Sequence, residues 1–144
     1  MKPTWVVIMD TEKARIFEQA GRQGELQEKD CLVNPEAHLR EQDLSSDRGG
    51  RGVGGALRGS HDLGDEQHFK KIKAHQFAKR IAEHLRKAAH EQDYDELVLC
   101  AEPRFLGIIR SELPGEVEQR VRREVHKDLG HLTRPEELRP HLLD

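Results

Sequence analysis

The sequence predicts an α/β domain with a mixed sheet of about five strands, and three observations support this prediction. Two short segments rich in β-branched and aromatic residues follow each other near the N-terminus, at 4–9 and 13–18. A long amphipathic helical pattern comes later, over 65–92. Strand and helix patterns then alternate to the C-terminus, as they do when helices connect parallel strands. The 144 residues fit one domain, 1–144.

The first three predicted strands form an antiparallel meander. The turn residues Asp10-Thr11-Glu12 separate the first two strands, which predicts a tight hairpin. Gly21 and Gly24 mark a second turn, and a weaker third strand follows over 25–33. The long helix is expected to bury one face, because apolar residues recur there at three-and-four spacing.

Strands and helices alternate in the second half of the predicted fold. Leu97–Ala101 is an apolar run without a polar face, which indicates a fully buried strand. Pro103 suits the first turn of a helix that ends before Pro114-Gly115. A strand at about 120–127 and a helix over 135–142 complete the order β-β-β-α-β-α-β-α. This is the arrangement of the ribonuclease H-like fold, in which later strands add parallel to the first.

Residues 45–64 are predicted to form a long flexible Gly/Arg-rich loop within this domain. Seven of the chain's twelve glycines lie there, and 48–58 holds three arginines and no acid. Guanidinium groups bridge phosphates, and glycines let the backbone come close to a partner. A solvated loop with incidental charge is the open alternative, because 48–58 has no aromatic side chain to stack on a base. The candidate RNA- or partner-binding residues are Arg48, Gly49, Gly50, Arg51, Gly54, Gly55 and Arg58, together with Arg104 at the start of a helix.

Lysines and acids outside the loop give two weaker signals. Lys70, Lys71 and Lys73 either extend the basic strip or form an ordinary solvated helix face. Asp10, Glu102 and Asp128 are the candidate catalytic acids of a metal-dependent nucleic-acid hydrolase, since such sites hold two cations with several carboxylates. Turn and capping roles explain these acids equally well.

Composition restricts the remaining classes of function. The net charge is -3, which argues against the basic surface typical of duplex-DNA binders. The longest apolar runs hold five residues, far fewer than the roughly 20 that a membrane-spanning helix needs, and no secretory signal is recognised, so we expect a cytoplasmic protein. Cys31 and Cys100 have neither disulfide-framework nor zinc spacing, and we expect neither a metal nor another cofactor.

Five stretches of the sequence resemble the bacterial host attachment protein family, whose members are described as proteins required for attachment to host cells. They are Trp5–Phe17, Leu44–Arg51, Ala101–Gly107, Lys127–Leu129 and Thr133–Leu142, and the resemblance runs in order over nearly the whole chain. The resemblance implies a role in attachment to host cells or surfaces through protein partners.

This family is in turn similar to the middle domain of archaeal and eukaryotic class 1 translation release factors. That similarity implies a ribonuclease H-like core, a glycine-rich loop before a long helix, and an RNA or ribosome partner. The release factors carry Gly-Gly-Gln in the loop, whereas Gly54-Gly55 is followed here by Ala56. The peptide-release chemistry is therefore not carried over.

Three functions follow from these observations. The first is a non-catalytic binding module that contacts RNA or a ribosomal surface through the Arg/Gly loop. The second is a factor for attachment to host cells that acts through protein partners. The third is a metal-dependent nucleic-acid hydrolase that uses Asp10, Glu102 and Asp128. The oligomeric state does not follow from the sequence.

Overall fold

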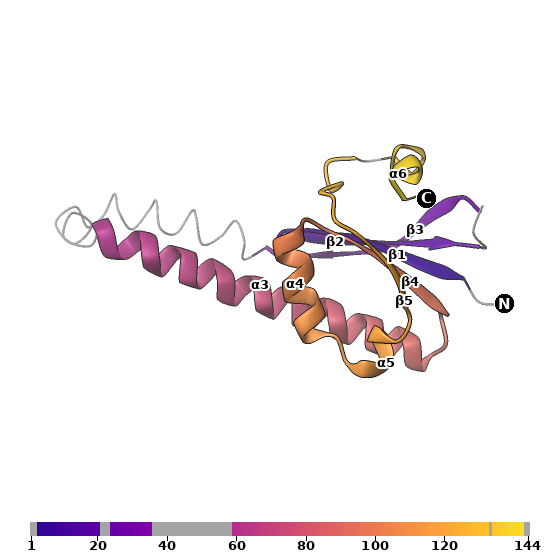
Figure 1. Cartoon of the computed structure of the whole chain (residues 1–144), viewed down its shortest axis with the longest axis horizontal. Helices are drawn as coiled ribbons and strands as arrows, with labels where there is room; N and C mark the ends of the chain where they lie inside the picture. The colour runs from indigo at the N-terminus through magenta and orange to yellow at the C-terminus, as the bar shows by residue number, and fades with distance from the viewer. Residues whose placement is uncertain (1–2, 21–23, 36–58, 133, 143–144) are drawn as a thin grey trace.

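The computed structural model describes residues 3–20, 24–35, 59–132 and 134–142, with the backbone alone for 59–66. Five strands and four helices lie in these ranges (Figure 1). In chain order they are β1 (Thr4–Met9), β2 (Lys13–Gln19), β3 (Leu26–Val33), α3 (Gly59–His90), β4 (Glu96–Cys100), α4 (Pro103–Glu112), α5 (Gly115–Glu118), β5 (Val121–Val125) and α6 (Pro135–Leu142). The predicted mixed α/β class is confirmed.

The strands form one five-stranded mixed sheet in the order β3-β2-β1-β4-β5. β1 pairs antiparallel with β2, and β2 pairs antiparallel with β3, so the predicted meander is present. β4 and β5 add on the other side of β1, and both of these pairings are parallel. The carboxyl ends of β1, β4 and β5 therefore meet at one edge of the sheet.

Helices α3, α4 and α5 cover one face of the sheet (Figure 1). The buried stripe of α3 starts at Ala74 and includes Ile81 and Leu85, which are both fully buried. Tyr94 follows the helix, and its hydroxyl donates a hydrogen bond of 2.7 Å to the Leu85 carbonyl oxygen. Burial raises the pKa of the Tyr94 phenol to about 12. The prediction that the long helix buries one apolar face is thus confirmed for the half of α3 that starts at Ala74.

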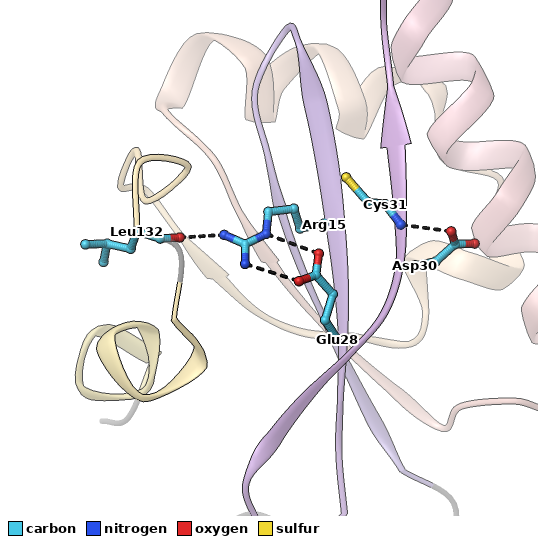
Figure 2. Close-up of polar contacts among 5 residues, drawn as sticks. All are labelled: Arg15, Glu28, Asp30, Cys31 and Leu132. Carbon is cyan, nitrogen blue, oxygen red and sulfur yellow. Dashed lines mark hydrogen bonds and ion pairs between the residues drawn. The ribbon is translucent and has the colours of Figure 1, made fainter.

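The other face of the sheet is covered by the C-terminal segment that contains α6 (Figure 1). Leu129 and Leu138 are buried there against apolar side chains of the sheet. The buried Arg15 guanidinium of β2 donates to both Glu28 carboxylate oxygens at 3.3 Å and to the Leu132 carbonyl oxygen at 2.5 Å, as Figure 2 shows. One arginine thus links β2, β3 and the C-terminal segment.

β3 forms an edge of the sheet, and two side chains bond to its backbone. The Asp30 carboxylate accepts a 2.8 Å hydrogen bond from the Cys31 backbone N–H (Figure 2). Arg80 of α3 donates a 3.1 Å hydrogen bond to the Val33 carbonyl oxygen. Two backbone groups near the C-terminal end of β3, which an edge strand could otherwise offer to another chain, are therefore already bonded.

Helix α3 begins at Gly59, six residues before the Asp65 start that the sequence predicts. The final part of the predicted loop, 59–64, is helical, so that part of the prediction is wrong. Gly59 and Gly64 each disfavour a helix by roughly 1 kcal/mol, but extending an existing helix adds one hydrogen bond for each residue fixed. Residues 45–58 of the predicted loop lie outside the described residues. No described helix is long and apolar enough to cross a membrane.

Candidate functional site

A cleft of about 710 Å³ opens beside the carboxyl edge of the sheet. Thr11 and Glu12 of the β1–β2 turn form one side of it, and Asn34 lies just beyond the end of β3. The other two sides are the first half of α3 and the first turns of α4. The cleft forms at this edge because β1 and β4 run parallel and end beside each other, so that the turn after β1 and the start of α4 are neighbours.

The α3 side of the cleft is basic. Lys70 and Lys71 are exposed, and Lys73 is half-buried. The Lys73 ammonium lies 5.2 Å from the centroid of the Phe69 ring and donates a 3.1 Å hydrogen bond to the Gln76 side-chain oxygen. No residue from 67 to 73 is buried, whereas Ala74 begins the core stripe of the same helix. The lysines thus occupy the part of α3 that packing leaves open to solvent.

The α4 side carries one more cation, Arg104, which is exposed. Glu102 is the N-cap of α4, and its Oε1 accepts a 2.9 Å hydrogen bond from the Phe105 backbone N–H. Pro103 follows it in the first turn, where its missing N–H costs nothing. Arg104 therefore lies near the positive end of the helix dipole, where a cation is unfavourable by about 0.3–1 kcal/mol.

Asn34 fixes the chain at the rim of the cleft. The side chain is buried, its Nδ2 donates a 3.0 Å hydrogen bond to the Thr11 carbonyl oxygen, and its backbone N–H donates a 2.8 Å bond to the Glu12 carbonyl oxygen. The chain passes from Asn34 and Pro35 into the segment that carries the predicted loop arginines. Asn34, eleven residues before the predicted loop at 45–64, is thus attached to the turn that lines the cleft.

Only one of the predicted RNA-binding residues lies in the described part of the chain. Arg104 lines the cleft from the first turn of α4, and the sequence also places it at the start of a helix. The remaining candidates, Arg48, Gly49, Gly50, Arg51, Gly54, Gly55 and Arg58, lie outside the described residues. Asn34, Phe69 and the turn residue Thr11 were missed as site residues, and only their shared position beside the carboxyl edge of the predicted sheet could have indicated them.

The three candidate catalytic acids have structural roles. Asp10 Oδ1 accepts hydrogen bonds from the backbone N–H groups of Glu12 (2.8 Å) and Lys13 (2.9 Å), which closes the hairpin. Asp128 Oδ1 accepts one from the Gly130 N–H at 3.3 Å, and Glu102 caps α4. Among the described residues, no three His, Cys, Asp or Glu side chains are grouped so that they could hold a metal ion.

Asp10 and Asp128 nevertheless come together at Gly130. A Cβ atom at Gly130 would lie 2.7 Å from Asp10 Oδ2 and 3.6 Å from Asp128 Oδ1. A side chain at Gly130 would therefore displace the Asp10 carboxylate, which closes the β1–β2 hairpin, while Asp128 holds the Gly130 N–H between β5 and α6. The sequence correctly predicts that acids follow the ends of β1 and β5. Both carboxylates, however, accept hydrogen bonds from nearby backbone N–H groups, as turn residues do.

Neither described cysteine is an activated nucleophile. Burial raises the pKa of the Cys100 thiol to about 11, and its Sγ donates to the Lys127 carbonyl oxygen at 3.3 Å. Cys31 is exposed on β3, and partial burial together with the Glu28 carboxylate raises the pKa of its thiol. The cleft, rather than either thiol, is therefore the candidate site.

Comparisons with known proteins agree with the resemblance to the host attachment protein family. An uncharacterized protein of Rickettsia prowazekii (strain Madrid E), RP470, is 37% identical over 63 residues. That alignment covers 42% of this chain and 42% of the Rickettsia protein, so the chain matches less than half the length of this relative. The family model described as "Protein required for attachment to host cells" matches residues 5–142, and the chain therefore belongs to this family.

Proposed function

We propose that this chain is a non-catalytic binding module for RNA, and that the cleft at the carboxyl edge of the sheet is its main contact. The observation that supports the proposal is the charge of the cleft. Lys70, Lys71 and Lys73 face the cleft from α3, and Arg104 faces it from α4. Cations on two elements can contact successive phosphates of one strand, and phosphate contacts supply most of the affinity for nucleic acid.

The acids of the cleft offset this charge only in part. Glu12 and Glu102 also line it, but the Glu102 carboxylate already accepts a hydrogen bond from the backbone of its own helix. Among the described residues that line the cleft, four cations therefore face two carboxylates, in a protein whose net charge is -3. A local basic site on a weakly acidic surface attracts a polyanion to one place on the molecule.

The position of Arg104 gives independent support. Helices favour acids in their first turn, yet the first turn of α4 has none and carries Arg104 instead. A residue that is unfavourable for the fold and exposed in a cleft is typical of a binding role.

The predicted arginine segment extends this proposal along the chain. Arg48, Arg51 and Arg58 would add phosphate contacts, while Gly49, Gly50, Gly54 and Gly55 would let the backbone approach the strand. Asn34 is bonded to the rim of the cleft, and the predicted loop begins only eleven residues later, at 45, so this short connection supports an interface that includes both.

A ribosomal RNA partner and a cytoplasmic location belong to the same proposal. The strand order, with an antiparallel meander followed by two parallel strands, supports the ribonuclease H-like class. We take 1–144 as one such domain, similar to the middle domain of the release factors, and that similarity is what suggests the ribosome.

The test is RNA binding measured by fluorescence anisotropy over a range of salt concentrations. The slope of log K against log[salt] should become less steep by about 1.4 in Lys71→Gln/Arg104→Gln, that is by about 0.7 for each lost contact with a single strand. Lys87→Gln/Arg110→Gln is the matched control, since it removes the same charge from exposed positions of the same two helices away from the cleft. An equal change in both variants, or no RNA binding by the natural chain, contradicts the proposal.

A separate variant tests the loop. Arg48→Gln/Arg51→Gln/Arg58→Gln should reduce co-sedimentation with ribosomes across the same salt range. Unchanged co-sedimentation would remove these three arginines from the interface and leave the cleft as the only contact.

The family description supports a second candidate, attachment to host cells through protein partners. Fractionation of the native cells separates the two candidates. Recovery of the protein with ribosomes supports RNA binding, whereas recovery at the cell surface supports attachment.

A further inference from the structure

We infer that the cleft holds an unpaired nucleotide of single-stranded RNA, with its base inside the cleft and its phosphates on the basic rim. This inference rests on the proposed RNA-binding function and adds the form of RNA that the site selects. It follows from the lining of the cleft, which differs between rim and floor. A site that bound only phosphates would need the basic rim but not the floor of the cleft.

The floor is apolar. Ala74 and Phe105 are buried, Ile108 is partly buried, and all three line the cleft. The volume of about 710 Å³ lies within the range of roughly 300–1,000 Å³ that is usual for small-ligand pockets. A nucleobase can pack a flat face on such a floor while its polar edge points away from it, whereas a phosphate does not fit there, because burial against apolar side chains penalises a charge.

Phe69 connects the floor to the rim. Its ring is half-buried, lines the cleft, and lies 5.2 Å from the Lys73 ammonium. The ammonium lies over the ring, and a base that takes its place on the ring would leave the ammonium next to the phosphate of the same nucleotide. The sequence offers no such ring within 48–58, so the structure supplies from α3 the stacking group that the arginine segment lacks.

A duplex cannot use this arrangement. Its bases are stacked and paired in the interior of the helix, and proteins recognise double-stranded RNA mainly by its shape and backbone. The rim could contact the phosphates of a duplex, but the floor would stay empty. Phe69 should therefore contribute to the binding of a single strand and not to that of a duplex.

The experiment compares a short RNA of mixed sequence, either free or annealed to its complement, by fluorescence anisotropy at one salt concentration. The natural chain should bind the single strand more tightly than the duplex. Phe69→Leu, which keeps an apolar side chain but removes the ring, should weaken single-strand binding about tenfold and leave duplex binding unchanged. Phe69→Tyr should keep the affinity. Ile72→Ala is the control, since Ile72 is exposed on the same helix and does not line the cleft.

The outcomes separate this inference from the proposed function. If both RNAs bind and Phe69→Leu affects neither or both equally, the inference is wrong and the proposed function stands. If the duplex binds more tightly than the single strand, the inference is also wrong. If neither RNA binds, both fail. Circular dichroism and thermal melting establish that each variant is folded.

Discussion

Helix α3 is packed differently along its length. From Ala74 to Ala89 one side of the helix is buried against the sheet, with Ile81 and Leu85 fully covered. From 67 to 73 no residue is buried, and lysines line the cleft instead. Figure 1 shows the first half of α3 extending past the end of the sheet. One continuous helix thus supplies both core packing and a binding surface.

The contrast shows how a rigid scaffold can present a charged surface. The packed half fixes the direction of the helix, and the backbone hydrogen bonds carry that direction into the open half. The open half can therefore carry lysines at defined positions without burying them. Changes in the packed half should alter stability, and changes around the cleft should alter binding.

The largest effect is expected in the packed half. Leu85→Ala should lower the free energy of unfolding by about 2–5 kcal/mol, because it leaves a cavity in a fully buried site. Ile72→Ala in the open half should change it by less than about 0.5 kcal/mol. Urea denaturation of both variants measures the difference. Similar losses in the two variants would show that the open half is packed as well.

The next effect depends on pH and on Tyr94, the only tyrosine. Its pKa in the folded protein is about 12, above the ordinary value near 10, so burial stabilises the neutral phenol. The folded state should keep this contribution below about pH 10 and lose it as the pH rises towards 12, with a total of roughly 2–3 kcal/mol. Phenolate absorbance should titrate near pH 12 in the folded protein. A midpoint near 10 in the folded protein would show that the hydroxyl is open to solvent.

A smaller effect, an increase in the free energy of unfolding, is expected in α4, which forms the other wall of the cleft. Gly107 is an exposed residue inside α4, and a Cβ there would meet nothing within 4 Å. Gly107→Ala should therefore raise the free energy of unfolding by about 1 kcal/mol and leave RNA affinity unchanged. Thermal melting and anisotropy measure the two quantities. Weaker RNA binding in this variant would place the interface further along α4 than the cleft.

The smallest effect on stability is expected at Arg104. Arg104→Glu should raise the free energy of unfolding by about 0.3–1 kcal/mol, because an acid suits the first turn of α4. The same variant should weaken RNA binding, since it reverses a charge in the cleft. Denaturation and anisotropy together test the trade-off. A variant that is less stable, or one that binds RNA as before, argues against a binding role for this arginine.

Regular elements were predictable because their side chains follow local periods. The alternation in β2 and the three-and-four spacing around Phe77 and Ile81 depend only on nearby residues, and the structure confirms both elements. The start of α3 was not predictable in this way. Glycines at 59 and 64 indicate a loop locally, whereas the helix continues through them from its packed half.

The cleft was predictable only in part. Arg104 could be found because it lies at the start of a predicted helix, and the lysines could be found as a run. Asn34, Phe69 and Phe105 are far apart in the sequence, and the order of the strands brings them together. A local sequence pattern does not show which distant residues come together, so the apolar floor of the cleft could be identified only from the structure.

The bonds on the outer side of β3 bear on how the protein behaves when it is concentrated. Exposed edge strands of different molecules can pair with one another, and this pairing can start aggregation. Here a second molecule that tried to extend the sheet beyond β3 would first have to displace the Asp30 carboxylate from the Cys31 N–H and the Arg80 guanidinium from the Val33 oxygen. These two side chains thus disfavour the addition of further strands to the sheet at β3.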